Sequence, residues 1–174
     1  MKTYILPGYS DKNKFWVDET VAFLKPAIPA IGLYWNHWDG SSTEDGWIEE
    51  EARRIINDSN NEKINIVAKS VGAMVCMAVL KLKPELVNKV ILCGIPFKDF
   101  LPGDEKRYES LKSVMPNNIL RIQNEEDNYG SFEKTESFVR SINPNIKVVS
   151  KPRNDHYYPY SEDFKNFLIE NNNQ

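Results

Sequence analysis

Nucleophilic catalysis by a serine combines a serine, a histidine and an acidic residue. The chain has a candidate for each: Ser70, His156 and Asp127. A serine hydroxyl is a weak nucleophile until a base, normally a histidine, takes its proton. The histidine in turn needs a carboxylate that fixes its tautomer and stabilises the imidazolium. The order serine, acid, histidine is one of the known orders of such a triad along a chain. The chemistry it predicts is attack on a carbonyl carbon with an acyl-enzyme intermediate.

The sequence around Ser70 predicts a sharp turn between a strand and a helix. The β-branched run 64–68 precedes it, and the helical apolar run 73–78 follows it. Such a turn strains the serine backbone, which requires small residues two positions away on either side, and Ala68 and Gly72 stand there. The turn also places the serine at a helix N-terminus, where N–H groups favour an oxyanion. Taken alone, the pattern also fits a serine that merely caps a helix.

Two backbone N–H groups are predicted to bind the oxyanion of the reaction. The mechanism requires the N–H of Val71, directly after the serine, and one N–H from the loop after the first strand, where Tyr9 is best placed. Gly8 lets the backbone approach closely, although Pro7-Gly8 is also simply a turn.

Short aliphatic runs alternate with helical patterns along the whole chain, which predicts an α/β protein with crossover units on a parallel sheet. The predicted strands are 3–6, 30–35, 63–68, 89–94, 118–123 and 146–150. The predicted helices are 15–25, 47–57, 71–83, 132–142 and 162–170, and 96–108 is predicted as a loop or short cap. In open parallel sheets the functional loops follow the carboxyl ends of the strands. Ser70, Asp127 and His156 each follow a predicted strand, so we expect them at one edge of the sheet.

These segments together resemble the α/β-hydrolase superfamily, in particular its small, nearly lidless serine hydrolases. The resemblance covers essentially all 174 residues and is carried by segments 5–9, 66–72, 124–127 and 154–156. It implies a three-layer α/β/α sandwich in one domain, residues 1–174, with a mostly parallel sheet of about six strands in the order 2-1-3-4-5-6. It also implies a carboxylesterase-like serine hydrolase with the triad Ser70, His156 and Asp127, a small-molecule acyl substrate, and no metal or organic cofactor.

The chain departs from the family pattern at several positions. Ala68 replaces the first glycine of the serine motif, which the turn tolerates only if a methyl group fits against the neighbouring helix. Lys69 holds the variable position, where its side chain can face solvent. Four other carboxylates compete with Asp127 for the role of the acid: Asp99, Asp155, Glu125 and Glu126. Asp127 is preferred because its offset from the strand end fits best, and Asp99 is second.

The composition argues against several other classes of protein. The 22 Lys and Arg residues against 25 Asp and Glu residues give a net charge of −3 without a basic block, so a nucleic acid or an anionic membrane is not an expected partner. The longest apolar run, 71–80, is too short to span a bilayer, and no signal-peptide core precedes Pro7, so a cytoplasmic location is expected. Cys76 and Cys93 lack metal or redox spacing and are interpreted as core residues. The oligomeric state is left open between a monomer and a weak dimer.

Two other functions stay open at this point. A hydrolase-like fold can bind a small molecule or a protein partner without turnover, and Ala68 and the competing acids leave room for that. A flavodoxin-like phosphate site requires a glycine- or hydroxyl-rich loop after the first strand, and segment 7–10 is a poor example. His37 is expected to pack or to line the pocket. Three tryptophans are expected in the core or at its rim: Trp35, Trp38 and Trp47.

Overall fold

The computed structural model describes residues 1–40, 43 and 45–170 of the chain. Within them, strands form one six-stranded sheet in the order β2-β1-β3-β4-β5-β6, and every neighbouring pair is parallel. The strands are β1 (Lys2–Leu6), β2 (Ala30–Gly32), β3 (Ile64–Lys69), β4 (Val87–Cys93), β5 (Ile119–Asn124) and β6 (Lys147–Lys151). The predicted α/β class and strand order are therefore confirmed.

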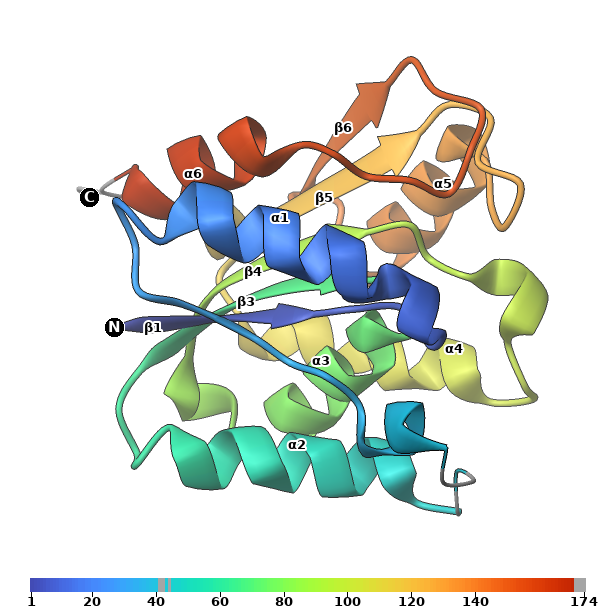
Figure 1. Cartoon of the computed structure of the whole chain (residues 1–174). Helices are drawn as coiled ribbons and strands as arrows, with labels where there is room; N and C mark the ends of the chain where they lie inside the picture. The colour runs from blue at the N-terminus through green and yellow to red at the C-terminus, as the bar shows by residue number, and fades with distance from the viewer. Residues whose placement is uncertain (41–42, 44, 171–174) are drawn as a thin grey trace.

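Helices cover both faces of the sheet and complete three layers (Figure 1). Helices α1 (Lys14–Leu24) and α6 (Ser161–Ile169) pack on one face. Helices α2 (Trp47–Asp58), α3 (Gly72–Leu82) and α5 (Phe132–Ile142) pack on the other. The short helix α4 (Asp104–Arg107) and several 3-10 turns occupy segment 97–113. In the part of the chain that the structure describes, none of the helices combines the length and the apolar character that crossing a membrane takes.

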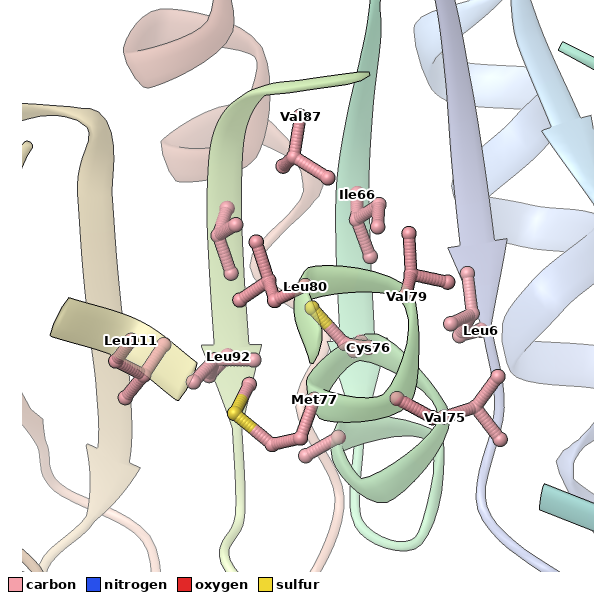
Figure 2. Close-up of a cluster of buried hydrophobic side chains, with 14 of the residues drawn as sticks. Leu6, Ile66, Val75, Cys76, Met77, Val79, Leu80, Val87, Leu92 and Leu111 are labelled. Atoms are coloured by element: carbon pink, nitrogen blue, oxygen red, sulfur yellow. The ribbon is translucent and has the colours of Figure 1, made fainter. Parts of the chain in front are cut away.

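The sheet separates two hydrophobic cores because successive strand side chains point to opposite faces. In β1, for example, Tyr4 and Leu6 belong to the core under α3, whereas Ile5 belongs to the core under α1. Helix α3 is buried almost all round, and Figure 2 shows its Cys76 and Val79 close to the side chains of the sheet. This burial explains why the run after Ser70 is apolar without a polar face.

Strand β2 is shorter than predicted. It spans only Ala30–Gly32 and pairs with β1 alone, as the edge of the sheet. The expected strand continued to Trp35, but the chain instead leaves the sheet and forms a 3-10 helix over Asn36–Asp39. The indole of Trp35 is buried in the core at 2% exposure, so its apolar character reflects packing rather than strand pairing.

Candidate active site

Ser70 lies on a sharp turn between the end of β3 and the start of α3. Its backbone is left-handed, with φ of +56°, and its N–H donates a 2.9 Å hydrogen bond to the carbonyl of Cys93 in β4. The other non-glycine residues with positive φ in the described chain are two asparagines, Asn60 and Asn61, a residue type that tolerates this region. A serine in this conformation is strained, as the predicted turn requires.

Small residues on both sides of Ser70 make this turn possible. Ala68 is fully buried in the core cluster that contains α3, so its methyl group is accommodated. A Cβ atom on Gly72 would lie 2.5 Å from the carbonyl oxygen of Leu6 and 2.6 Å from that of Pro7. The start of α3 therefore rests directly on the end of β1, which brings Val71 next to the loop that carries Tyr9.

Asp127 and His156 form a hydrogen-bonded pair across the loops that follow β5 and β6. The distance from Nδ1 of His156 to Oδ2 of Asp127 is 2.7 Å. The same carboxylate accepts hydrogen bonds from the Tyr158 hydroxyl at 2.5 Å and from the Tyr129 N–H at 2.8 Å. A carboxylate only accepts, so Nδ1 carries the proton of the neutral imidazole and Nε2 is left with a lone pair.

Burial of the Asp127 carboxyl favours its neutral form, but its hydrogen-bond donors outweigh that effect. The side chains of His156 and Tyr158, the charge of His156 and the N–H of Tyr129 together lower the pKa of Asp127 below its ordinary value. The carboxylate is therefore ionised at neutral pH and can stabilise a protonated imidazole.

Two of the competing carboxylates have other partners. Asp155 forms an ion pair with Arg153 at 2.5 Å, and Glu125 accepts a 3.1 Å hydrogen bond from the Ser150 hydroxyl. The imidazole of His156 thus pairs with the carboxylate that the strand-end offset favours.

The His156 ring packs against the end of β4. A Cβ atom on Gly94, which follows Cys93, would lie 2.7 Å from Cε1 of His156, and the Tyr129 ring lies 4.4 Å away, centroid to centroid. Because Cys93 also bonds the backbone of Ser70, the serine and the histidine approach the same strand end.

A hydrogen bond between Ser70 and His156 is not formed. Nε2 of His156 is buried and has no hydrogen-bond partner among the described residues, and the Ser70 hydroxyl has none among them either. Bonds between nucleophile and base are often long without substrate and tighten when it binds. The structure thus joins Asp127 to His156 but leaves the Ser70 hydroxyl unpaired.

The two predicted oxyanion donors flank the contact between α3 and the end of β1, Val71 directly before Gly72 and Tyr9 in the loop after β1. The N–H groups of Val71 and Tyr9 donate to no acceptor in the described chain. The carbonyl of Tyr9 accepts hydrogen bonds from His37 Nε2 at 2.8 Å and Trp38 Nε1 at 2.7 Å. The ring of His37 also stacks on the Tyr9 ring at 4.4 Å. His37 is thus a packing residue that supports this loop.

The prediction that Lys69 faces solvent is wrong. Its side chain is 6% exposed, and Nζ donates a 2.7 Å hydrogen bond to Oδ1 of Asn13. Lys69 is the last residue of β3 and projects toward the face covered by α1, where Nζ lies 5.7 Å from the centre of the Trp16 ring. Burial lowers the pKa of Lys69 to about 8.

Two supporting residues were not predicted. Tyr158 contacts Asp127 directly, and Gln123 donates to the same carboxylate oxygen at 3.3 Å. Gln123 is fully buried and also accepts from the guanidinium of the buried Arg121. The available signal was two polar residues, Arg121 and Gln123, that alternate with apolar residues inside a strand.

Sequence comparisons find no match for this chain, either to a protein-family model or to a curated protein. Solved structures, however, are similar to it. An α/β serine hydrolase homologue from Coxiella burnetii superposes with a TM-score of 0.73 at 16% identity, over 97% of this chain and 83% of the other. For the 2-hydroxy-6-oxo-6-phenylhexa-2,4-dienoate hydrolase from Rhodococcus the TM-score is 0.69 at 14% identity, over 97% and 89%. For an esterase from Pyrococcus furiosus it is 0.63 at 15% identity, over 96% and 80%.

Identities this low establish the architecture, while the reaction has to be argued from the site. The sheet order, the left-handed serine after β3 and the likeness to these structures lead to one conclusion. The chain has the α/β-hydrolase fold.

Proposed function

We propose that the protein is a serine hydrolase that cleaves a carboxylic ester or a related acyl compound. The proposal depends on one observation: a strained serine and a hydrogen-bonded Asp127–His156 pair occur at the carboxyl ends of strands of one parallel sheet. A helix cap explains the serine alone, and a surface loop explains the histidine alone. Neither explains why a buried carboxylate fixes that histidine with Nε2 free.

In the proposed reaction the Ser70 hydroxyl attacks the carbonyl carbon of the substrate. Nε2 of His156 takes the hydroxyl proton and then gives it to the leaving alcohol. Asp127 holds Nδ1–H throughout and stabilises the imidazolium. The acyl group remains as an ester on Ser70 until a water molecule, deprotonated by His156, releases it as a carboxylic acid.

The oxyanion of each tetrahedral intermediate would accept hydrogen bonds from the N–H groups of Val71 and Tyr9. Both groups are free of acceptors in the described chain, and α3 contributes the positive end of its dipole at the same place. A single donor of this kind contributes about 10²- to 10³-fold to turnover.

A fluorophosphonate probe tests the proposal because it phosphonylates only an activated serine. We expect wild-type protein to gain the mass of one probe and Ser70→Ala to gain none. Ser113→Ala, a matched change on an exposed turn, should label like the wild type. His156→Ala should label at least about 10³-fold more slowly because the hydroxyl loses its base. Labelling that persists in Ser70→Ala would contradict the proposal.

The acyl group of the substrate is the next question. The similar structures include an esterase and a dienoate hydrolase, so ester, thioester, amide and carbon–carbon cleavage all belong in the test. Hydrolysis rates for p-nitrophenyl esters of increasing chain length, and for an acetyl thioester, would rank these possibilities.

A second candidate is a hydrolase-like fold that binds a small molecule or a protein partner without turnover. The missing hydrogen bond between Ser70 and His156 favours it. It predicts that folded wild-type protein, checked by circular dichroism, neither labels with the probe nor hydrolyses p-nitrophenyl acetate.

A further inference from the structure

We infer that Trp35 is a positioning residue that orients the oxyanion donor of Tyr9. The inference rests on the proposed function, because it assigns a role within that reaction. It concerns one buried hydrogen bond: Nε1 of the Trp35 indole donates to the carbonyl oxygen of Gly8 at 2.9 Å.

This hydrogen bond fixes the plane of a single peptide group. The carbonyl of Gly8 and the N–H of Tyr9 belong to the same peptide unit, which is planar and trans. In a trans peptide the C=O and N–H bonds point in opposite directions. Because the carbonyl points at Trp35, the Tyr9 N–H points away from it, out of the core that holds the indole.

The surroundings of Trp35 make this orientation firm. The indole is 2% exposed and packs edge-on against Trp47 at 5.8 Å, so it has little freedom to follow a rotating peptide. A hydrogen bond in such a low-dielectric environment is stronger than in water, and a bonded carbonyl also makes the N–H of its own peptide a better donor.

A second side chain, that of Asn13, also confines the loop. A Cβ atom on Gly8 would lie 2.9 Å from Nδ2 of Asn13, and that Nδ2 donates to the carbonyl of Ser10 at 2.8 Å. Lys69, next to the serine nucleophile, in turn donates to Asn13. Gly8 is thus held by the buried indole of Trp35 and has no room for a Cβ atom beside the Asn13 side chain.

The other hydrogen bonds to this loop act on a different peptide. His37 and Trp38 donate to the carbonyl of Tyr9, which belongs to the peptide that carries the Ser10 N–H. His37 and Trp38 therefore hold the next peptide group of the loop. Among the described residues, only Trp35 donates a hydrogen bond to the peptide group that contains the Tyr9 N–H.

The experiment removes the indole N–H with as little change of shape as possible. One variant is Trp35→3-benzothienylalanine, introduced by site-specific suppression, in which sulfur replaces the N–H group. The second is Trp35→Phe. The matched control is Trp47→Phe, which alters the same aromatic cluster but leaves the bond to Gly8 intact. Thermal unfolding identifies any variant that does not fold.

Two readouts are measured on each protein. The first is the reaction with p-nitrophenyl acetate, analysed as kcat and KM separately. The second is the ¹⁵N relaxation of the Tyr9 amide in the free protein. We expect both Trp35 variants to lose about 10- to 100-fold in kcat, part of the value of one oxyanion donor, with KM changed less than about 2-fold. The Tyr9 amide should become mobile in these variants. Trp47→Phe, which keeps the hydrogen bond to Gly8 but alters ring contacts with Trp35 and Tyr9, should change both readouts less than either Trp35 variant does.

A benzothienylalanine variant that keeps both the wild-type kcat and an ordered Tyr9 amide would overturn the inference. A decrease in kcat that is accompanied by an increase in KM of the same fold size would also overturn the inference, because it indicates general disruption of the active site. If wild-type protein neither reacts with the ester nor labels with the fluorophosphonate probe, the proposed function fails, whereas the amide relaxation still decides whether Trp35 holds the peptide.

Discussion

Asp127 combines two properties that the other carboxylates of the strand-end loops do not share. Its side chain is fully buried, and one oxygen accepts hydrogen bonds from both His156 and Tyr158. The donors are fixed by packing, so the carboxylate has one orientation. It can therefore decide which nitrogen of His156 carries the proton.

This role is tested by Asp127→Asn, which keeps the shape of the side chain. The amide nitrogen of asparagine can donate to Nδ1, which places the imidazole proton on Nε2 and removes the base. We expect kcat/KM for p-nitrophenyl acetate to fall by about 10⁴-fold. Asp99→Asn, at the second predicted acid, should leave kcat/KM within about 2-fold of wild type. The reverse pattern would assign the role to Asp99.

Lys69 gives a prediction for the pH dependence of stability. Burial lowers its pKa to about 8, whereas an unfolded chain restores the ordinary value near 10.5. Below pH 8 the lysine is charged in both states, and its burial costs free energy. Between about pH 8 and 10.5 the folded state releases the proton first, so the unfolded state binds more protons and the free energy of unfolding rises with pH.

The measurement compares wild type with Lys69→Met by urea unfolding from pH 7 to 10. The difference in free energy of unfolding should be constant below pH 8 and then shift in favour of the wild type, by at most about 1.4 kcal/mol per pH unit. The tyrosines titrate in both proteins, so their contribution cancels in the difference between wild type and Lys69→Met. A difference that does not vary with pH would mean that Lys69 is not desolvated.

At the scale of elements, the contact between α3 and the end of β1 sets the geometry of the site. Gly72 touches the carbonyls of Leu6 and Pro7, so this contact fixes the serine turn relative to the loop of Tyr9. A methyl group there has no space, because backbone atoms cannot move aside as a flexible side chain does.

Gly72→Ala should therefore destabilise the fold by about 1–3 kcal/mol through overpacking. If the proposed function holds, the folded fraction should also lose most of its activity toward p-nitrophenyl acetate, because the loop that carries the Tyr9 N–H is displaced. Gly103→Ala is the control: its Cβ meets no atom within 4 Å, and its cost is limited to about 1 kcal/mol for a left-handed backbone. Urea unfolding and p-nitrophenyl acetate hydrolysis measure the two effects. Wild-type kcat in Gly72→Ala would show that the loop tolerates the displacement.

The sequence predicts elements well where one local pattern determines them. Helix α5 spans Phe132–Ile142, as predicted, because Ser131 caps it and its apolar residues recur at helical spacing. The sequence does not predict contacts between residues that are far apart along the chain. The bond of Trp35 to Gly8 and that of Lys69 to Asn13 join separate segments, and no periodicity encodes them. The predicted strand 30–35 is longer than β2 for the same reason. The length of an edge strand depends on how far it pairs with its single neighbour, which here is β1.

At the scale of the whole molecule, each face of the sheet has its own buried thiol. Cys76 lies in the core under α3, and Cys93 in the core under α1 and α6. Burial raises the pKa of Cys93 to about 12 and that of Cys76 above its ordinary value. Both thiols are inert until the surrounding core opens.

We propose that residues 1–174 fold as one domain, and the two thiols test this. If the sheet and both helical layers unfold together, Cys76 and Cys93 become reactive at the same urea concentration. The variants Cys76→Ala and Cys93→Ala, each with a single thiol, can be titrated with a disulfide reagent to measure this. Midpoints that differ after correction for the stability of each variant would show that one face opens alone.

His156 reaches the site from the loop after the last strand, whereas Ser70 is placed by strands formed much earlier in the chain. A ribosome-bound chain that has emerged only through α5 already contains the hydroxyl of Ser70 and the carboxylate of Asp127, but it lacks the imidazole of His156. Under the proposed mechanism the polypeptide would stay chemically inert during most of its own synthesis, and a capacity to attack esters would arise only as the final segment joins the sheet.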